Sequence, residues 1–231
     1  MKTSSPLLVA LLLLGFSAFA QIKPKQEDWF AYDLTYDYWL DAPDGVEQSW
    51  RSNGHSFSFT DEVLFGEGSH FSFAYGLGFT SNNFYNNVSL QTDANTGEEY
   101  FLPLSTDSIN SNKLTVQYIH VPIELRFRSS PSEKGNFFRF YVGGKVGVRV
   151  NSYSKLKTDQ IDLQYNNLGA LNRFFYGVYT RVGYSYVSLY AYYGLSNLFE
   201  EAYTNNGVSY NQLSGAVDAI RPLSVGISLS L

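Results

Sequence analysis

The sequence of 231 residues contains no cysteine, so disulfide bridges and thiolate metal sites are excluded. After the first twenty residues it also lacks any apolar run long enough for a membrane-spanning helix, which needs about 20 residues. Charged residues make up only 16 % of the chain, and the formal net charge is −5. Nucleic-acid binding usually requires a basic face, so this charge balance argues against a nucleic-acid partner.

The first twenty residues have the parts of a secretory signal peptide. Lys2 precedes the apolar stretch PLLVALLLLGFSAFA, which ends in the small-residue pattern Ala18-Phe19-Ala20. This stretch is too short for a spanning helix, and the next residue, Gln21, is not the cysteine of a lipoprotein anchor. We therefore predict a signal peptide at residues 1–20 and one mature domain at residues 21–231.

The mature part is rich in aromatic residues, with 19 Tyr and 18 Phe, and its central stretch at residues 113–153 alternates strictly. Apolar side chains fall on one face of each expected strand there, and polar or charged side chains fall on the other. Each run exceeds the roughly 9–11 residues with which a tilted strand crosses a bilayer, whereas soluble strands average about 5–6. This pattern predicts a membrane hairpin whose apolar face contacts lipid.

The same alternation predicts strands at residues 28–40, 54–65, 70–80, 173–184, 187–198 and 221–231, which gives eight strands with the central hairpin. The connections alternate in length. The long ones are the loop with Pro43, Asp44 and Gly45 and the polar loops 81–112, 151–172 and 199–219. Asp61 falls on the lipid-facing parity, so we expect a bulge there or a position at the interface. A soluble sandwich has no reason to separate its connections by length. The expected fold is therefore all-β: a closed antiparallel eight-stranded up-and-down transmembrane β-barrel, in the outer membrane, with both termini periplasmic.

The inward parity of these strands predicts an ionic cluster inside the barrel. Its members are Asp33, Asp37, Glu62, Glu124, Arg126, Arg139, Lys145, Arg149 and Arg181. An eight-stranded barrel is just wide enough to be filled by side chains, which favours a packed interior over a conducting pore. A turn centred near Ser132 would place Glu124 beside Arg139, with Arg126 two residues along the same face.

No motif in the sequence predicts catalysis, a metal or a cofactor. His55, His70 and His120 lie on different strands without metal-ligand spacing, and the GGKVG segment does not match the phosphate-binding loop. His120 and Glu124 are about 13 Å apart along one strand, beyond hydrogen-bond reach. We expect no enzyme activity, and a lipid-modifying outer-membrane enzyme stays as an alternative.

Several segments resemble the PorT-like outer-membrane β-barrel family of the Bacteroidota. They are GLGFTSNNFY, YIHVPIELRFRS, FRFYVGGKVGVRVNSYSK, FFYGVYTRVGYSYVSLYAYYGLSNLF and RPLSVGISLSL. The resemblance implies an outer-membrane barrel, and the namesake of the family is implicated in type IX secretion and, in some relatives, gliding.

These observations predict an outer-membrane barrel with a structural or interaction role through its extracellular loops. Its expected partners are outer-membrane lipid and a protein bound by the loops. A component of a secretion, gliding or envelope-biogenesis machinery is the alternative. Because binding residues usually lie on loops, we expect recognition in residues 82–112, which carry the acids Asp93, Glu98, Glu99 and Asp107.

Overall fold

The computed structural model describes residues 28–67, 69–95, 97, 99–104, 110–200 and 219–231, and this part of the chain is built from β-strands. The strands are β1 (Phe30–Leu40), β2 (Asn53–Leu64), β3 (Phe71–Tyr85), β4 (Val88–Thr92), β5 (Glu99–Pro103), β6 (Ser111–Arg128), β7 (Phe138–Lys157), β8 (Asp162–Asn166), β9 (Phe174–Tyr184), β10 (Val187–Gly194) and β11 (Arg221–Ser230). Within the described ranges, no helix has the length and apolarity needed to cross a membrane.

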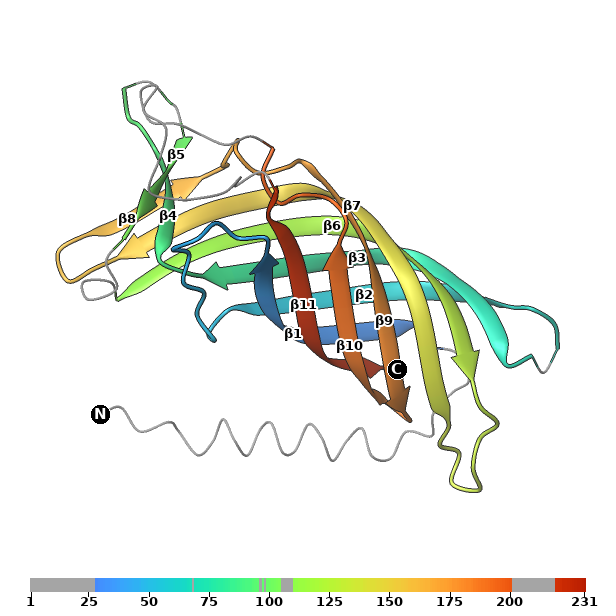
Figure 1. Ribbon diagram of the computed structural model, residues 1–231. Coiled ribbons are helices and arrows are strands. Elements are labelled where there is room, and N and C mark those ends of the chain that lie inside the picture. The colour runs from blue at the N-terminus through green and yellow to red at the C-terminus, as the bar shows by residue number, and fades with distance from the viewer. Residues whose placement is uncertain (1–27, 68, 96, 98, 105–109, 201–218) are drawn as a thin grey trace.

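Eight of these strands close into a ring in the order β1, β2, β3, β6, β7, β9, β10, β11 and back to β1 (Figure 1). Every neighbouring pair is antiparallel. The ring closes where β1 meets β11, from Ala31 opposite Ser230 to Leu40 opposite Arg221. The predicted eight-stranded up-and-down barrel is therefore confirmed.

Alternation along each strand separates the two faces of the barrel wall. In β2, Phe57 and Phe59 are 39 % and 50 % exposed on the outside, whereas Ser56 and Ser58 are buried inside. Because every second side chain points to the same face, the outside becomes an apolar band and the inside a polar core. This inside-out arrangement suits a wall whose outer solvent is lipid.

Two of the predicted loops contain strands, so their assignment as loops was wrong. Strand β3 continues to Tyr85, and residues 81–112 also hold the β4–β5 hairpin. Strand β7 continues to Lys157 and pairs with β8 inside residues 151–172. The polar side chains read as loop-like instead bond to one another on the sheet, as when Thr115 donates to Asn83 over 2.9 Å. Most of the predicted loop 199–219, like Glu98 and Asp107, lies outside the described residues.

Strand β7 carries the bulge of the barrel. Gln117 lies opposite Asn151 and Tyr118 lies opposite Arg149, which leaves Val150 as an extra residue. Below it the even positions of β7 face outward, and above it the odd positions do. The bulge considered at Asp61 is wrong, because Asp61 pairs with Tyr75 in an unbroken register. Asp61 is exposed and lies just beyond the last β1–β2 pair, at the barrel end that holds the described termini.

Candidate functional site

The barrel interior is occupied by side chains in successive layers, and the first layer lies at the end that holds the termini. Asp28 accepts hydrogen bonds from Arg139 at 2.9 Å and from Tyr141 at 2.6 Å. Glu62 pairs with Arg126 at 2.9 Å, and the second terminal nitrogen of Arg128 donates to it over 2.8 Å. Charges removed from water require such partners, and in this layer each carboxylate contacts at least two cations.

Glu124 occupies the next layer, where its carboxylate lies between two guanidinium groups. Arg126 donates to it over 2.6 Å, Arg181 contacts it on the other side, and the Tyr179 hydroxyl donates over 2.6 Å. Arg181 also holds Asp33, with nitrogen–oxygen distances of 3.0 Å. Strands β1, β6 and β9 are thereby linked through one ion network.

The pairing of Glu124 with Arg139 is wrong. Arg128 lies opposite Arg139, so the hairpin turn is centred between Glu133 and Lys134 rather than near Ser132, and Glu124 lies opposite Gly143. A glycine there leaves room for Tyr179, whose ring would lie 2.7 Å from an added Cβ at Gly143. Arg126 is beside Glu124 as expected.

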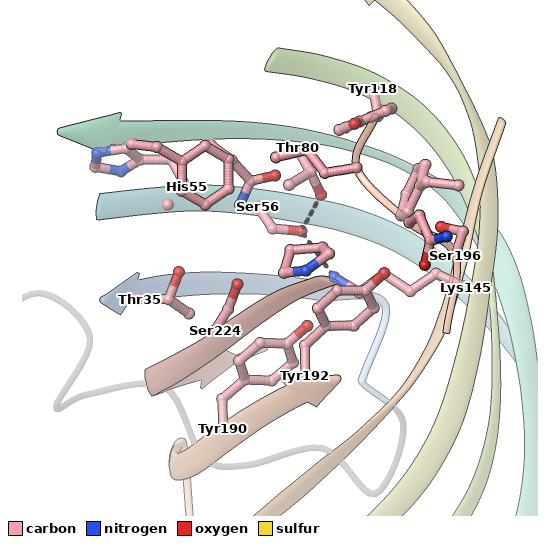
Figure 2. A pocket seen from close by; sticks show the side chains of 17 residues that line it. Thr35, His55, Ser56, Thr80, Tyr118, Lys145, Tyr190, Tyr192, Ser196 and Ser224 are labelled. Carbon is pink, nitrogen blue, oxygen red and sulfur yellow. Dashed lines mark hydrogen bonds between the residues drawn. The ribbon is translucent and has the colours of Figure 1, made fainter. Parts of the chain in front are cut away.

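Lys145 forms the third layer, above Glu124. Its ammonium nitrogen lies 5.2 Å from the ring centres of Tyr179 and Tyr190, 5.4 Å from that of Tyr192, and 3.4 Å from the Ser56 hydroxyl. Figure 2 shows Lys145, Ser56, Tyr190 and Tyr192 beside a cavity of about 30 Å³. A water centre needs roughly 10–15 Å³, so the cavity has room for about two waters.

Asp37 lines the same level of the barrel and is held by neutral groups. Thr35 donates to one carboxylate oxygen over 2.7 Å and Asn82 to the other over 2.6 Å. Arg149 takes a different place from the other predicted cluster members. It is half-buried, and it donates to Ser152 over 3.0 Å and to the Leu168 carbonyl near the outer end.

The negative and positive formal charges inside the barrel are equal in number. Five acids and five bases are buried in the described interior: Asp28, Asp33, Asp37, Glu62 and Glu124, with Arg126, Arg128, Arg139, Lys145 and Arg181. A water-filled channel lined by one sign of charge would favour one ion over another, whereas this interior is neutral and packed.

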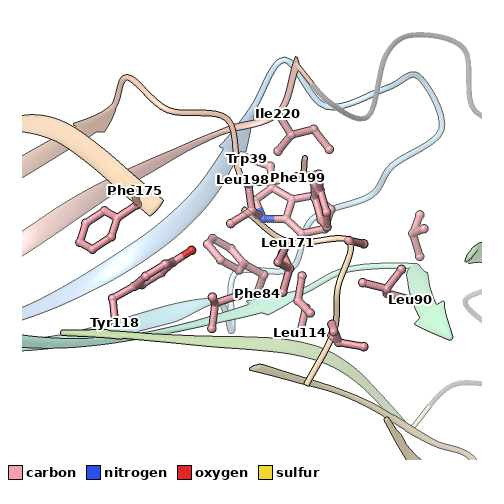
Figure 3. Packing of buried hydrophobic residues seen from close by; sticks show 14 of the residues in the cluster. Trp39, Phe84, Leu90, Leu114, Tyr118, Leu171, Phe175, Leu198, Phe199 and Ile220 are labelled. Atoms are coloured by element: carbon pink, nitrogen blue, oxygen red, sulfur yellow. The ribbon is translucent and has the colours of Figure 1, made fainter. Parts of the chain in front are cut away.

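An apolar plug closes the opposite end of the barrel (Figure 3). Its side chains come from barrel strands and from the segments beyond them, and they include Trp39, Phe84, Leu90, Phe101, Leu114, Tyr118, Leu168, Leu171, Phe175, Leu198, Phe199 and Ile220. Trp39 packs against Phe84 and Phe199 with ring centres 5.5 and 5.6 Å apart. Burial of this many apolar groups holds the outer segments over the lumen.

The histidines remain separate from one another. His120 is buried beside Thr80 and the ring of Phe175. His55 is on the outside, where its Nδ1 shares a hydrogen bond of 2.7 Å with the Tyr32 hydroxyl. His70 donates a hydrogen bond of 2.8 Å to the Arg128 carbonyl. The described ranges contain no group of three or more His, Cys, Asp or Glu side chains placed to hold a metal ion.

Four interior partners are absent from the predicted cluster: Asp28, Arg128, Tyr141 and Tyr179. Arg128 has the inward parity of β6 and pairs with Glu62. Even-numbered residues of β1 face outward, so the sequence pattern places Asp28 on the lipid side. Because β1 begins only at Phe30, Asp28 does not follow this alternation, and its side chain points inward. Tyr141 and Tyr179 do have the inward parity, yet a tyrosine also suits the aromatic girdle of a barrel. Their hydroxyl bonds to Asp28 and Glu124 become visible only when the cross-strand register is known.

An apolar outer band, a charge-balanced core and an apolar plug at one end are the features of a transmembrane β-barrel. The chain belongs to the outer membrane protein beta-barrel domain family, whose model matches residues 13–200. This membership places the protein in the outer membrane. Neither the curated proteins nor the solved structures include a match.

Proposed function

We propose that the protein is a non-conducting outer-membrane barrel that acts through a folded extracellular cap. The cap is defined here as strands β4, β5 and β8, the upper parts of β6 and β7, and residues 167–171. The observation that carries this proposal is the apolar plug, which joins the cap to the barrel and blocks the lumen with the same side chains. A barrel that conducts solutes would require an open lumen, which this apolar plug does not leave.

Polar contacts also order the cap. The carboxylate of Glu99 in β5 accepts the backbone N–H groups of Gly169 and Ala170 over 2.6 and 2.8 Å, which ties the hairpin to the segment after β8. Charge-assisted bonds of this kind are stronger than neutral ones. A rigid surface on a rigid scaffold can bind a partner without a large ordering cost.

We further propose that both termini are periplasmic and that residues 1–20 are a signal peptide. The connections β2–β3, β6–β7 and β9–β10 are short and lie at the end with the termini, as in other bacterial barrels. Within its family, the segments quoted above support a PorT-like member. A component of a secretion, gliding or envelope-biogenesis machinery is the alternative proposal, and that resemblance is what supports it.

Crosslinking in intact outer membranes, followed by purification, tests the proposed role. We compare the wild-type chain with a variant in which Val88–Pro103 is replaced by a short Gly-Ser linker. The matched control is Lys145→Met, which changes the closed interior and leaves the cap intact. Loss of a crosslinked partner in the linker variant alone supports the cap as the binding surface, provided both variants stay heat-modifiable in SDS gels.

The opposite result would contradict the proposal: a partner kept without the hairpin and lost with Lys145→Met. The identity of a captured partner separates a secretion complex from a structural role. We also propose that the protein is not a lipid-modifying enzyme, because His120 faces Thr80 and Phe175 inside the wall and not the lipid. Turnover of outer-membrane lipid that disappears in His120→Ala would overturn this.

A further inference from the structure

The outward face of the barrel changes character along one side only. On β3, β6 and β7 the apolar band ends at Phe79, Ile119 and Val150, and polar side chains follow immediately. We call this continuation the polar wall, and its accessible residues are Ser81, Asn83, Tyr85, Lys113, Gln117, Asn151, Tyr153 and Lys155. The bulge at Val150 brings the residues of β7 into this face.

The polar wall extends well beyond the membrane core. Strands β6 and β7 have 18 and 20 residues, roughly twice the length that a tilted strand needs to cross. The residues of β6 between Ser111 and Gln117 add about 20 Å along the strand and, at the usual tilt, about 15 Å along the membrane normal. Strands β10 and β11, with 8 and 10 residues, have no such extension.

Side chains of the polar wall are fixed in place by mutual hydrogen bonds. Asn151 donates to Gln117 over 3.0 Å, and Asn83 donates to Asn53 of the neighbouring β2 over 3.2 Å. The Lys113 ammonium lies 3.3 Å from the Tyr153 hydroxyl and 5.2 Å from the centre of its ring. The result is an ordered sheet of amides, hydroxyls and aromatic rings directly beyond the apolar band.

Positive charge accompanies this surface. Lys113 and Lys155 lie opposite each other in the β6–β7 register, Lys157 is exposed at the end of β7, and Arg51 lies over the Tyr85 ring at 5.1 Å. Asp162 pairs with Lys155 at 3.4 Å, and the Lys155 side chain is still 40 % exposed. Like charges directly opposite each other are unfavourable unless an anion lies between them.

We propose that the polar wall binds the phosphorylated saccharide headgroup of the outer-leaflet glycolipid. Its cations match the phosphates, its amides match sugar hydroxyls, and its height continues the lipid-facing band into the zone where the headgroup lies. This inference rests on the proposed orientation, with the cap outside the cell. A protein covering the same face is the competing occupant that the experiment must separate.

Binding is measured with the purified full-length barrel in a non-ionic detergent, by native mass spectrometry. The probes are bis-phosphorylated lipopolysaccharide and the same glycolipid after enzymatic removal of its phosphates. The test variant is Lys113→Gln with Lys155→Gln. The control variant is Lys134→Gln with Arg221→Gln, which loses two positive charges away from the polar wall: Lys134 is exposed in the β6–β7 turn, and Arg221 pairs with Asp41 where β11 meets β1.

Each basic side chain near an anionic surface contributes about fivefold in affinity, so the test variant should bind the phosphorylated probe about 30-fold more weakly. The control should match the wild type, and Lys113→Arg with Lys155→Arg should restore binding. Raising the salt concentration should weaken wild-type binding. A heat-modifiable band in SDS gels shows that each variant is folded.

Equal affinity of the wild type and the folded test variant, or equal affinity for the phosphorylated and phosphate-free probes, would overturn the proposal. A protein crosslinked to the polar wall in cells, with no glycolipid selectivity in vitro, would assign the face to that protein. Because binding in detergent does not depend on orientation, surface labelling of the cap in cells tests the proposed topology separately.

Discussion

The Glu124–Arg181 contact offers the most direct measurement of the interior network. Leucine at Glu124 would leave Arg126 with Glu62 and Arg181 with Asp33, and leucine at Arg181 would leave Asp33 without its two-nitrogen contact. Removing one member of a buried ion pair typically costs about 3–5 kcal/mol. Each single variant should therefore lower the free energy of unfolding by about that amount.

The double variant Glu124→Leu with Arg181→Leu restores a neutral interior and should lose less than the sum of the single variants. We expect a coupling of about 2 kcal/mol, within the range of about 0.5–3 kcal/mol for residues of one network. Glu124 with Arg139 is the matched cycle, because Arg139 contacts Asp28 and not Glu124. That cycle should show a clearly smaller coupling, because Glu124 and Arg139 are connected indirectly, through Arg126 and Asp28.

Reversible urea unfolding of the barrel in lipid vesicles measures all these free energies. Equal coupling in the two cycles would refute the register of β6 and β7 and the assignment of partners in the core. A coupling below about 0.5 kcal/mol for Glu124 with Arg181, the scale of an exposed pair, would show that water screens this network.

Three further outcomes are expected. The purified monomer should show no porin-sized conductance in planar bilayers, and a stable conductance step would contradict the closed lumen. Gly76→Ala should fold poorly because its Cβ would lie 1.9 Å from the Phe59 carbonyl oxygen, whereas Gly144→Ala, whose nearest contact is at 3.5 Å, should fold normally; equal folded fractions in SDS gels would be inconsistent with this packing. Glu99→Ala should speed hydrogen exchange at the amides of Gly169 and Ala170 by about 10- to 150-fold, since a bond to a charged group contributes about 1.5–3 kcal/mol. Unchanged exchange rates by mass spectrometry would mean that the carboxylate does not hold this segment.

Strand parity carried most of the fold prediction. A lipid-facing strand must be apolar at every second position, so segments such as Phe174–Tyr184 can be placed within a residue from the sequence alone. Above the membrane this signal changes, because the outward side chains become polar and apolar ones such as Leu114 and Leu156 turn inward. The upper part of β7 and strand β8 were therefore read as a loop, although they pair from Tyr153 opposite Asn166 to Lys157 opposite Asp162.

The sequence predicts which charged side chains point into the barrel, but not which of them form ion pairs. Inward parity identifies Asp33, Glu124 and Arg181 as interior side chains, because only one face of each strand can be polar in lipid. Which charges meet depends on the register, and an error of about one residue in the turn centre moved Arg139 away from Glu124. The apolar plug could not be predicted, since it assembles from single residues of many connections.

The pairing of β1 with β11 has a consequence for how the chain reaches its final state. Ala31 meets Ser230, so the seam joins the first and last strands of the described chain. Neighbouring hairpins such as β6–β7 form by local contacts, whereas the seam carries the largest loop-closure entropy of any contact in the ring. Before this pairing forms, β1 presents an unpaired edge that can accept a strand from another protein. Protection against such edge-to-edge association therefore comes with the β1–β11 contact and not with any single hairpin.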